Sequence, residues 1–316
     1  LYEEYKIDNL CLAGGVALNC VANGKILKQN KFKNIWIQPA AGDAGGALGA
    51  AYALWYHENK NIRTTQKDDK MKGSYLGPQF SNNEVSDFLQ NKGANFNHYS
   101  HEKIIDYTVQ EICNNKAVGW FQGKMEFGPR ALGARSIIAD PRSKTMQKNL
   151  NLKVKFRESF RPFAPIILYE DLKDWFDINV ESPYMLIVAQ VLKKHLLELN
   201  ELQLNTFGIE KLNIPKSSIP AVTHVDYSAR IQTIHKETNY KLHSLLKKFK
   251  KNTSVPILVN TSFNVRGEPI VCTPEDAFNC FMGTDIDVLV IENFLLFKED
   301  QNKNLLLNYK DKYELD

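Results

Sequence analysis

Residues 117–140, AVGWFQGKMEFGPRALGARSIIAD, contain two apolar segments joined by a turn that is rich in glycine and cations. The flanking sequences AVGWFQG and RSIIAD are short and apolar, which predicts two buried β-strands. Between residues 121 and 137 lie Lys124, Arg130 and Arg135, with Glu126 as the only acid. Partly buried cations need an anionic partner, because an unpaired buried charge is costly. The stretch therefore predicts a sheet with an anion site beside it, in which Lys124 has no assigned role.

A second group of cations follows in residues 153–165, KVKFRESFRPFAP. Lys155, Arg157 and Arg161 alternate with phenylalanines, and the nearby acids Asp140 and Glu158 are too few to neutralise them. Guanidinium groups match phosphate oxygens in a bidentate manner. We therefore expect the missing anion to come from a ligand that carries phosphate.

Residues 257–269, ILVNTSFNVRGEP, predict a strand that ends in polar groups. The hydroxyl and amide side chains of Asn260, Ser262 and Asn264 suit the recognition of a phosphate or carbonyl group. An Asx or Ser turn at the strand exit accounts for the same residues equally well. Both interpretations stay open at this point.

The alternating sequence VTHVDYSARIQTI predicts one strand over residues 222–234, with His224, Asp226, Ser228 and Arg230 on one face. A Ser-His-Asp hydrolase is disfavoured, because same-face neighbours along a strand lie ~6.5 Å apart. No G-x-S-x-G elbow is present either. We interpret Arg230 as an anion contact.

The first sixty residues predict strand, helix, strand and helix, with a glycine-rich turn after each strand. Gly14 and Gly15 in LAGGVALN (residues 12–19) suit a nucleotide phosphate at a helix start, although a tight turn is the simpler explanation. Asp43 in QPAAGDAGGALGAA (residues 38–51) is either a helix N-cap or a metal ligand. The pair of turns resembles the nucleotide-and-metal corner of actin-like ATPase folds.

The chain divides into two predicted domains, residues 1–60 and 74–316, separated by a polar linker at residues 61–73. The second is predicted to be an α+β domain whose last strand is DVLVIE (residues 287–292), with an irregular Leu-rich insertion at 193–216. The fold class is thus α/β followed by α+β.

Composition excludes several classes of protein. The net charge is +4 and the lysines form local patches rather than a long arm, so we expect no nucleic-acid partner. No apolar run approaches the ~18–20 residues of a membrane span, so we expect no membrane association. Five scattered cysteines are typical of a reducing compartment, which predicts a cytoplasmic protein.

Together these motifs resemble the O-carbamoyltransferase family of nodulation and antibiotic-biosynthesis proteins. The resemblance extends from about residue 9 to 295 and includes CLAGGVALNCVANGKIL, VGWFQGKMEFGPRALGARSIIADPR, KFRESFRPFAP, SPYML and PILVNTSFNVRGEP. It implies the end of an actin-like (sugar-kinase type) domain, followed by a mixed α/β domain similar to threonylcarbamoyl-adenylate synthases. It also implies that ATP and carbamoyl phosphate form carbamoyl-adenylate, whose carbamoyl group then passes to a hydroxyl of a small-molecule or glycoside acceptor.

The resemblance also implies roles for individual residues. The catalytic set would be Arg130, Lys155 and Arg161. Carbamoyl phosphate and ATP would be bound by Arg130, Arg135, Lys155, Arg161, Arg230, Asn260, Ser262 and Asn264. Gly14, Gly15 and Asn19 would contact nucleotide in the first domain, and Asp43 would bind a metal. Fe²⁺ is expected only in a full-length parent protein, Mg²⁺ would accompany ATP, and the chain would form a homodimer.

One family feature is missing: a His-x-x-x-His metal pair that belongs upstream in the first domain. We therefore expect that the chain begins partway through that domain and makes carbamoyl-adenylate without transferring it. Two alternatives stay open, namely a threonylcarbamoyl-adenylate synthase-like tRNA-modification enzyme and an inactive truncated nucleotide-binding module.

Overall fold

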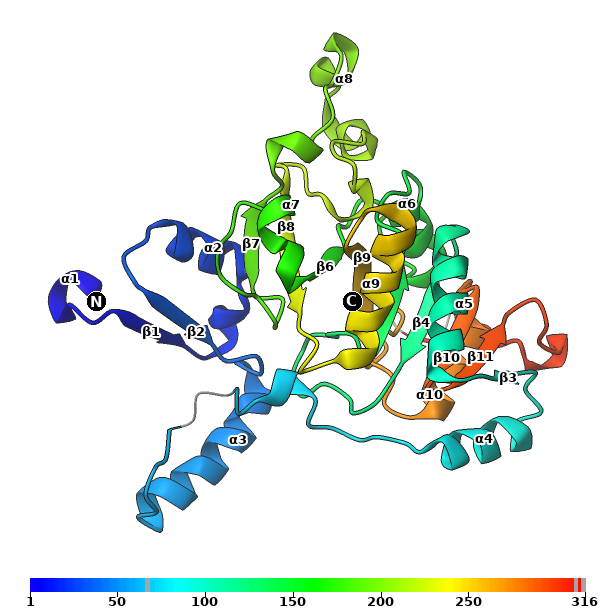
Figure 1. Ribbon diagram of the computed structural model, residues 1–316, viewed down its shortest axis with the longest axis horizontal. Coiled ribbons are helices and arrows are strands. Elements are labelled where there is room, and N and C mark those ends of the chain that lie inside the picture. Colours follow the sequence, from blue (N-terminus) through cyan, green and yellow to red (C-terminus); the bar gives the residue numbers. More distant parts are fainter. Residues whose placement is uncertain (66–68, 310–311, 314–316) are drawn as a thin grey trace.

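The computed structural model describes residues 1–65, 69–309 and 312–313 (Figure 1). Residues 66–68 of the predicted linker, and 310–311 and 314–316 of the predicted second domain, lie outside the described residues. A two-stranded sheet is formed by the N-terminal segment (residues 1–65), and a nine-stranded sheet is formed by the rest of the chain. This large mixed sheet confirms the prediction of an α+β architecture, while the actin-like assignment and the domain boundaries stay predictions.

The N-terminal segment forms two parallel strands and three helices. Leu10 of the first strand lies opposite Ile35 of the second. The elements, in chain order, are α1 (Tyr2–Tyr5), β1 (Asn9–Leu12), a 3-10 turn (Gly15–Leu18), α2 (Cys20–Lys28), β2 (Asn34–Ile37) and α3 (Asp43–Ala53), which continues as a π-helical turn (Leu54–Glu58).

The large sheet has the strand order β3-β11-β10-β4-β5-β9-β6-β8-β7. Pairs β10/β4 and β6/β8 are parallel, and the other pairs are antiparallel. The strands are β3 (Asn97–His98), β4 (Val118–Phe121), β5 (Arg135–Ala139), β6 (Ala164–Leu168), β7 (Ile187–Gln190), β8 (Ser228–Ile234), β9 (Ile257–Ser262), β10 (Val288–Ile291) and β11 (Phe294–Phe297). Every residue of β4, β5 and β6 is buried, as expected for central strands.

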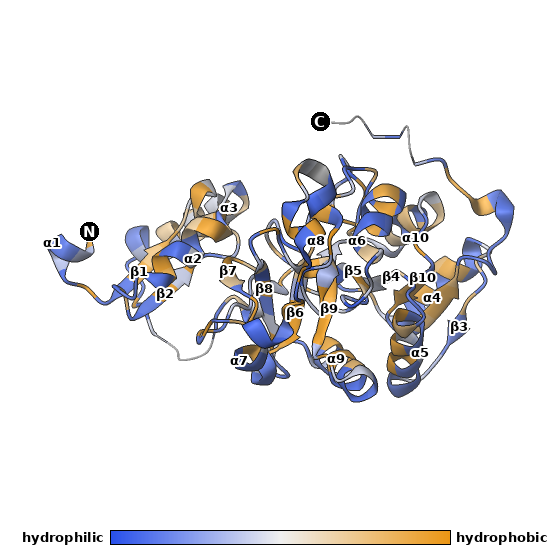
Figure 2. Ribbon diagram, turned by 90° about the horizontal axis from the view of Figure 1, so that it is seen from above, coloured by the Kyte–Doolittle hydropathy of each residue, from blue (hydrophilic) through white to orange (hydrophobic). Residues whose placement is uncertain are grey.

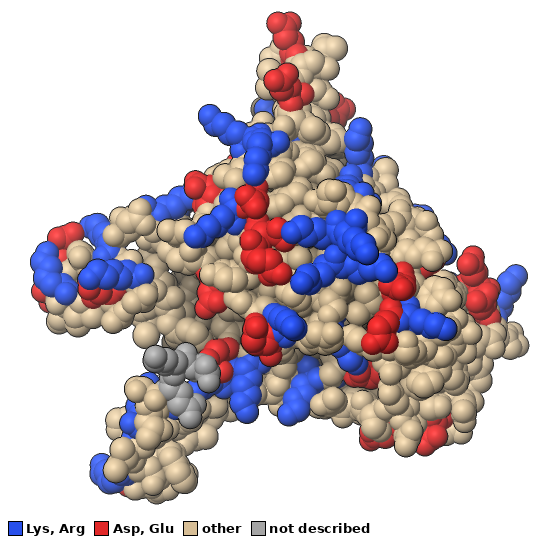
Figure 3. All heavy atoms as spheres, viewed as in Figure 1, with Lys and Arg blue, Asp and Glu red and all other residues tan. Residues whose placement is uncertain are grey.

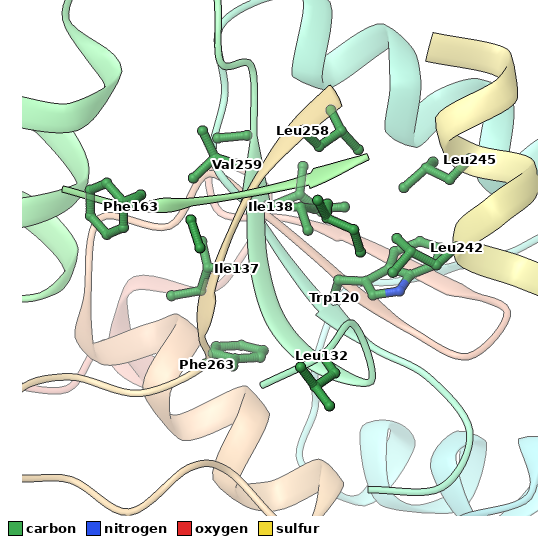
Figure 4. Close-up of a cluster of buried hydrophobic side chains, with 14 of the residues drawn as sticks. Trp120, Leu132, Ile137, Ile138, Phe163, Leu242, Leu245, Leu258, Val259 and Phe263 are labelled. Carbon is green, nitrogen blue, oxygen red and sulfur yellow. The ribbon is translucent and has the colours of Figure 1, made fainter. Parts of the chain in front are cut away.

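Helices cover both faces of this sheet. Figure 2 shows α5 and α9 on one face and α6 and α10 on the other. Side chains from β4, β5, β9 and α9 meet in the core shown in Figure 4, where Trp120, Ile138 and Leu245 are almost fully buried. The helices are α4 (Asn82–Asn91), α5 (His101–Cys113), α6 (Met146–Asn149), α7 (Leu172–Trp175), α8 (Glu201–Asn205), α9 (Tyr240–Thr253) and α10 (Pro274–Gly283).

The edge strand β7 is covered by α2 of the N-terminal segment. The buried Asn23 side chain donates from Nδ2 to the carbonyl oxygens of Leu186 (3.0 Å) and Ala17 (2.8 Å). A Cβ atom at Gly24 would overlap the Val188 carbonyl oxygen, so this close approach requires glycine. The Asn23 side chain and the close approach of Gly24 thus join the N-terminal segment to one edge of the large sheet.

Charged residues of α9 illustrate the lysine patches. Lys and Arg gather over this helix in Figure 3, while Leu242, Leu245 and Phe249 face the core. Lys248 binds Asp106 (2.6 Å) and Lys250 binds Asp171 (2.7 Å). This face is a solvated helix surface with partners of its own. Within the described residues, no helix has the length and apolarity to cross a membrane.

Two predictions about elements are wrong, and one strand was not predicted. Residues 222–227 form a turn rather than the first half of a strand, because Ser228 N–H donates to Asp226 Oδ1 and His224 N–H donates to the Ser228 carbonyl. The last strand is β11, not the one at 287–292, since Phe294–Phe297 turns back against β10. A short strand β3 extends the sheet beyond β11.

Candidate functional site

The loop between β4 and β5 is organised by Glu126. This buried carboxylate accepts hydrogen bonds at Oε1 from the main-chain N–H groups of Leu132 (2.6 Å) and Ala134 (2.7 Å). Gly128 and Gly133 have φ values of 133° and 104°, which other residues rarely adopt. The loop is thus closed around its own acid, with Arg130 at its outer part.

Arg135 is fully buried, and its two terminal nitrogens donate to main-chain carbonyls, while its Nε has no partner among the described residues. Its guanidinium carbon lies 3.5 Å from the centre of the Phe121 ring. Nη1 donates to the carbonyls of Gln122 (3.3 Å) and Gly123 (3.1 Å), and Nη2 donates to that of Pro78 (3.1 Å). Burial lowers the pKa of Arg135 to about 10. Arg135 lies outside the cavity described next.

Four arginines from distant segments meet at a cavity of about 280 Å³. Arg130 comes from the β4–β5 loop, Arg157 and Arg161 from the segment before β6, and Arg230 from β8. None of the described residues that line the cavity is acidic. They are Pro129, Arg130, Ala131, Arg157, Arg161, Pro162, Phe163, Ala164, Met185, Arg230, Asn260, Thr261 and Ser262.

The electrostatics of this arginine cavity show a shortage of negative charge. Burial, reinforced by Arg161, lowers the pKa of Arg157 to about 10. Burial, reinforced by Arg130 and Arg157, lowers the pKa of Arg230 to about 10. Glu158 pairs with Arg161 (2.8 Å), but both side chains are largely exposed at the rim. An anion in the cavity would therefore relieve repulsion that protein carboxylates leave in place.

Lys155 lies beneath the end of β9 and outside the cavity lining. Only 3% of it is exposed. Its Nζ donates to the Ser262 carbonyl and Oγ (3.2 Å for Oγ) and to the Asn264 carbonyl and Oδ1 (both 2.8 Å). Burial, followed by Arg157, lowers the pKa of Lys155 to about 7. Lys155 and Asn264 thus support the strand end, where Ser262 reaches the cavity.

The N-terminal segment contacts two of the cavity arginines, although none of its described residues lines the cavity. Arg130 Nη2 lies 3.4 Å from the Leu18 carbonyl, and Arg230 contacts Cys20. Asn19, between them, caps α2 by accepting a hydrogen bond from Ala22 N–H (3.1 Å). Gly14, Gly15 and Asn19 are exposed and do not line the cavity.

Asp43 is exposed at the start of α3, directly after the N-cap Gly42. Across residues 1–65, 69–309 and 312–313, no three or more His, Cys, Asp or Glu side chains are grouped so as to hold a metal ion. The residues around Asp43 therefore do not supply a metal site, and we derive no step through a metal. The ligand role of Asp43 stays a prediction.

Some cavity residues were not among the predicted site residues. Arg157 was noted only as part of the second cation group. Its position four residues before Arg161, in the same segment, was the signal in the sequence that it could share a site with Arg161. Met185 and Thr261 also line the cavity. Met185 has a φ of 57°, a left-handed conformation that is uncommon for this side chain. Nothing in the sequence SPYML indicates that conformation.

Two larger hollows differ from the arginine cavity in charge. One, of about 1060 Å³, lies between α6, α10 and the C-terminal tail and carries Lys153 and Lys298 together with Asp285 and Asp287. The other, of about 940 Å³, lies beside α3 and carries both acids and cations. Their charges are mixed. A further hollow of about 260 Å³ is lined by Lys144, Lys148 and Lys216 and also has no acid among its described lining residues, so the arginine cavity is distinguished by its four guanidinium groups, whose forked donors match phosphate oxygens.

Comparison with known proteins identifies the family. Residues 1–52 match the family described as Carbamoyltransferase N-terminus, and residues 109–298 match Carbamoyltransferase C-terminus. The chain is 56% identical to an uncharacterised protein of Synechocystis, covering 100% of this chain and 52% of that protein. It is 39% identical to Nodulation protein NolO of Bradyrhizobium diazoefficiens (92% and 50%) and 33% identical to Nodulation protein U of Rhizobium tropici (92% and 44%).

The chain spans about half the length of these relatives. The longer of the two matches, residues 109–298, contains the β4–β5 loop and all four cavity arginines. The chain belongs to the carbamoyltransferase family.

Proposed function

We propose that the arginine cavity binds carbamoyl phosphate and that the chain uses it, with ATP, to form carbamoyl-adenylate. The observation that carries this proposal is the convergence of four arginines on a small cavity whose described lining holds no acid. Guanidinium groups bind phosphate oxygens in a bidentate manner. The pKa values of Arg157 and Arg230 are lowered by burial and, to a smaller extent, by the neighbouring arginines. Family membership supports carbamoyl chemistry.

The proposed reaction has two steps, each of which forms one bond and breaks another. Water first releases phosphate from carbamoyl phosphate, leaving carbamate. A carbamate oxygen then attacks the α-phosphorus of ATP, and the bond to the β-phosphate breaks to release pyrophosphate. Both steps gather anions, so fixed cations lower the barrier by offsetting repulsion and stabilising charge at phosphorus. Arg130, Arg157, Arg161 and Arg230 are positioned for this role. Lys155, Arg135 and Asn264 would support the walls of the cavity.

Transfer of the carbamoyl group to a hydroxyl of a small-molecule or glycoside acceptor is proposed for proteins with the full length of the relatives. Gly14, Gly15 and Asn19 would serve nucleotide binding there, with Asp43 as one metal ligand. All five cysteines of this chain are free, which supports a reducing, cytoplasmic setting.

The test is ATP–pyrophosphate exchange that depends on carbamoyl phosphate. Arg130→Ala and Arg230→Ala are expected to weaken carbamoyl phosphate binding by about tenfold or more, because each removes a charged hydrogen-bond donor from a partly buried site. Arg142→Ala is the matched control, since Arg142 binds Asp140 (2.5 Å) outside the cavity. Exchange that is unchanged in both cavity variants would contradict the proposal. No exchange in folded wild-type protein would favour an inactive nucleotide-binding module.

A further inference from the structure

Asn260 presents a hydrogen-bond acceptor that the protein leaves unused. The residue lies on β9, is 1% exposed and lines the arginine cavity. Its Oδ1 is buried and has no hydrogen-bond partner in the described part of the chain. Buried side-chain oxygens are rarely left unpaired, because the lost hydration is not recovered. An unpaired oxygen on a residue that lines a cavity therefore points to a group on a ligand.

The orientation of the Asn260 amide is set by its neighbours. Nδ2 donates to the Ala131 carbonyl (3.1 Å) and to Gln232 Oε1 (2.6 Å). Gln232 is also buried, and its own Nε2 donates to the Leu132 carbonyl (2.8 Å), so its oxygen must face Asn260. Rotating the Asn260 amide would set Oδ1 against two oxygens. The atom that Asn260 offers to the cavity is consequently an acceptor.

The same cavity also contains an unused donor. Arg130 Nε is buried and has no partner among the described residues. A ligand that completes both residues must therefore carry an anionic acceptor and an N–H or O–H donor. The volume of about 280 Å³ restricts it to a small molecule.

We propose that Asn260 Oδ1 accepts a hydrogen bond from the carbamoyl N–H₂ group, which makes Asn260 the residue that selects carbamoyl phosphate over acyl phosphates. This inference rests on the proposed function and assigns a role within it. The arginines recognise phosphate and do not distinguish carbamoyl phosphate from an acyl phosphate of the same charge. Acetyl phosphate, the acyl phosphate of the same size, has a CH₃ group where carbamoyl phosphate has NH₂. Its binding would therefore leave Oδ1 buried and unpaired.

Two stable phosphonates test this assignment directly. Phosphonoacetamide and acetonylphosphonate carry the same phosphonate and carbonyl groups and differ in having NH₂ or CH₃ at the end. Titration calorimetry on wild-type protein is expected to show about tenfold tighter binding of phosphonoacetamide. In Asn260→Leu, which removes the acceptor, the two ligands are expected to bind within about twofold of each other. Thermal unfolding of the variant checks that it is folded.

A second variant tests the positioning of the amide. Gln232→Leu leaves Asn260 in place but removes the oxygen that holds its Nδ2, so the preference for phosphonoacetamide should fall while phosphonate binding persists. Gln301→Leu is the control, because it also removes a buried amide but one that binds Asn95 and Phe297 at the opposite edge of the sheet. The control should keep the wild-type preference.

The outcomes separate this inference from the proposed function. Equal binding of both phosphonates to wild-type protein, or an unchanged preference in Asn260→Leu, would overturn the role of Asn260 while leaving the anion site intact. Failure of wild-type protein to bind phosphonoacetamide, carbamoyl phosphate and inorganic phosphate would remove the anion site and both proposals with it.

Discussion

At the scale of single residues, Glu126 fixes the conformation of a loop that carries cations, without forming an ion pair with any of them among the described residues. Its Oε1 accepts hydrogen bonds from main-chain N–H groups of the β4–β5 loop and forms no ion pair with a guanidinium group among the described residues. Burial raises the pKa of Glu126, and the two N–H donors act in the opposite direction. The loop conformation, and with it the place of Arg130, therefore depends on an acceptor at this position.

We expect Glu126→Ala to destabilise the protein by about 2–4 kcal/mol, because the buried N–H groups of Leu132, Ala134 and Arg135 lose their acceptor. Glu126→Gln keeps an oxygen at the same place and should cost clearly less. Urea unfolding measures both, with Glu111→Ala on α5 as a control carboxylate that pairs with Lys116 (3.1 Å) away from the loop. Equal losses in the Ala and Gln variants would argue against the role of the oxygen.

Lys155 should make stability depend on pH. Its pKa is about 7 in the folded chain and about 10.4 when a lysine is unfolded, so the unfolded chain binds more protons between these values. The free energy of unfolding should accordingly rise as pH increases from 7 towards 10, and this contribution is lost as pH falls back to 7. Lys155→Met should flatten that rise in urea unfolding at pH 7, 8 and 9. Identical slopes for the two proteins would contradict the assignment.

At the scale of elements, local signals mark the starts and the buried faces of several helices. Ser81 and Thr273 form capping boxes at the starts of α4 and α10, and α9 buries one apolar face. The sequence misled at residues 222–227, because alternation of polar and apolar residues is shared by a strand and by this turn. Tyr227 has a φ of 62°, which interrupts the extended chain before β8.

The contact of α2 with β7 is the element-level feature that joins the two sheets. Gly24→Ala would raise helix propensity by up to about 1 kcal/mol, but its Cβ would overlap the Val188 carbonyl. We expect the overlap to dominate, with a net destabilisation of about 1–3 kcal/mol. Gly46→Ala in α3 is the matched control, since its Cβ would have no neighbour within 4 Å and should be neutral or stabilising. Thermal unfolding of both variants shows whether the overlap with the Val188 carbonyl or the gain in helix propensity dominates. A stabilised Gly24→Ala variant would contradict the close contact of α2 with β7.

At the scale of the whole molecule, the arginine cavity exists because of strand order. It lies where β9 ends and where β5, β6 and β8 begin, which the antiparallel pairs β5/β9 and β9/β6 and the parallel pair β6/β8 place at one end of the sheet. The N-terminal segment contacts two of the cavity arginines through Leu18 and Cys20. No local stretch of sequence contains enough of these groups to bind an anion alone.

The sequence by itself determined the main strands and helices, the excess of cations in residues 121–137 and 153–165, and the resemblance to carbamoyltransferases. These features depend on the composition of short segments and on the spacing of residues within them, both of which can be read from the sequence. Only the tertiary structure decided which cations line the cavity. Arg130, Arg157, Arg161 and Arg230 line the cavity, whereas Arg135 and Lys155 bind main-chain carbonyls. The direction of a buried cation depends on which acceptors the packed chain brings near it, and those acceptors come from segments far apart in the sequence.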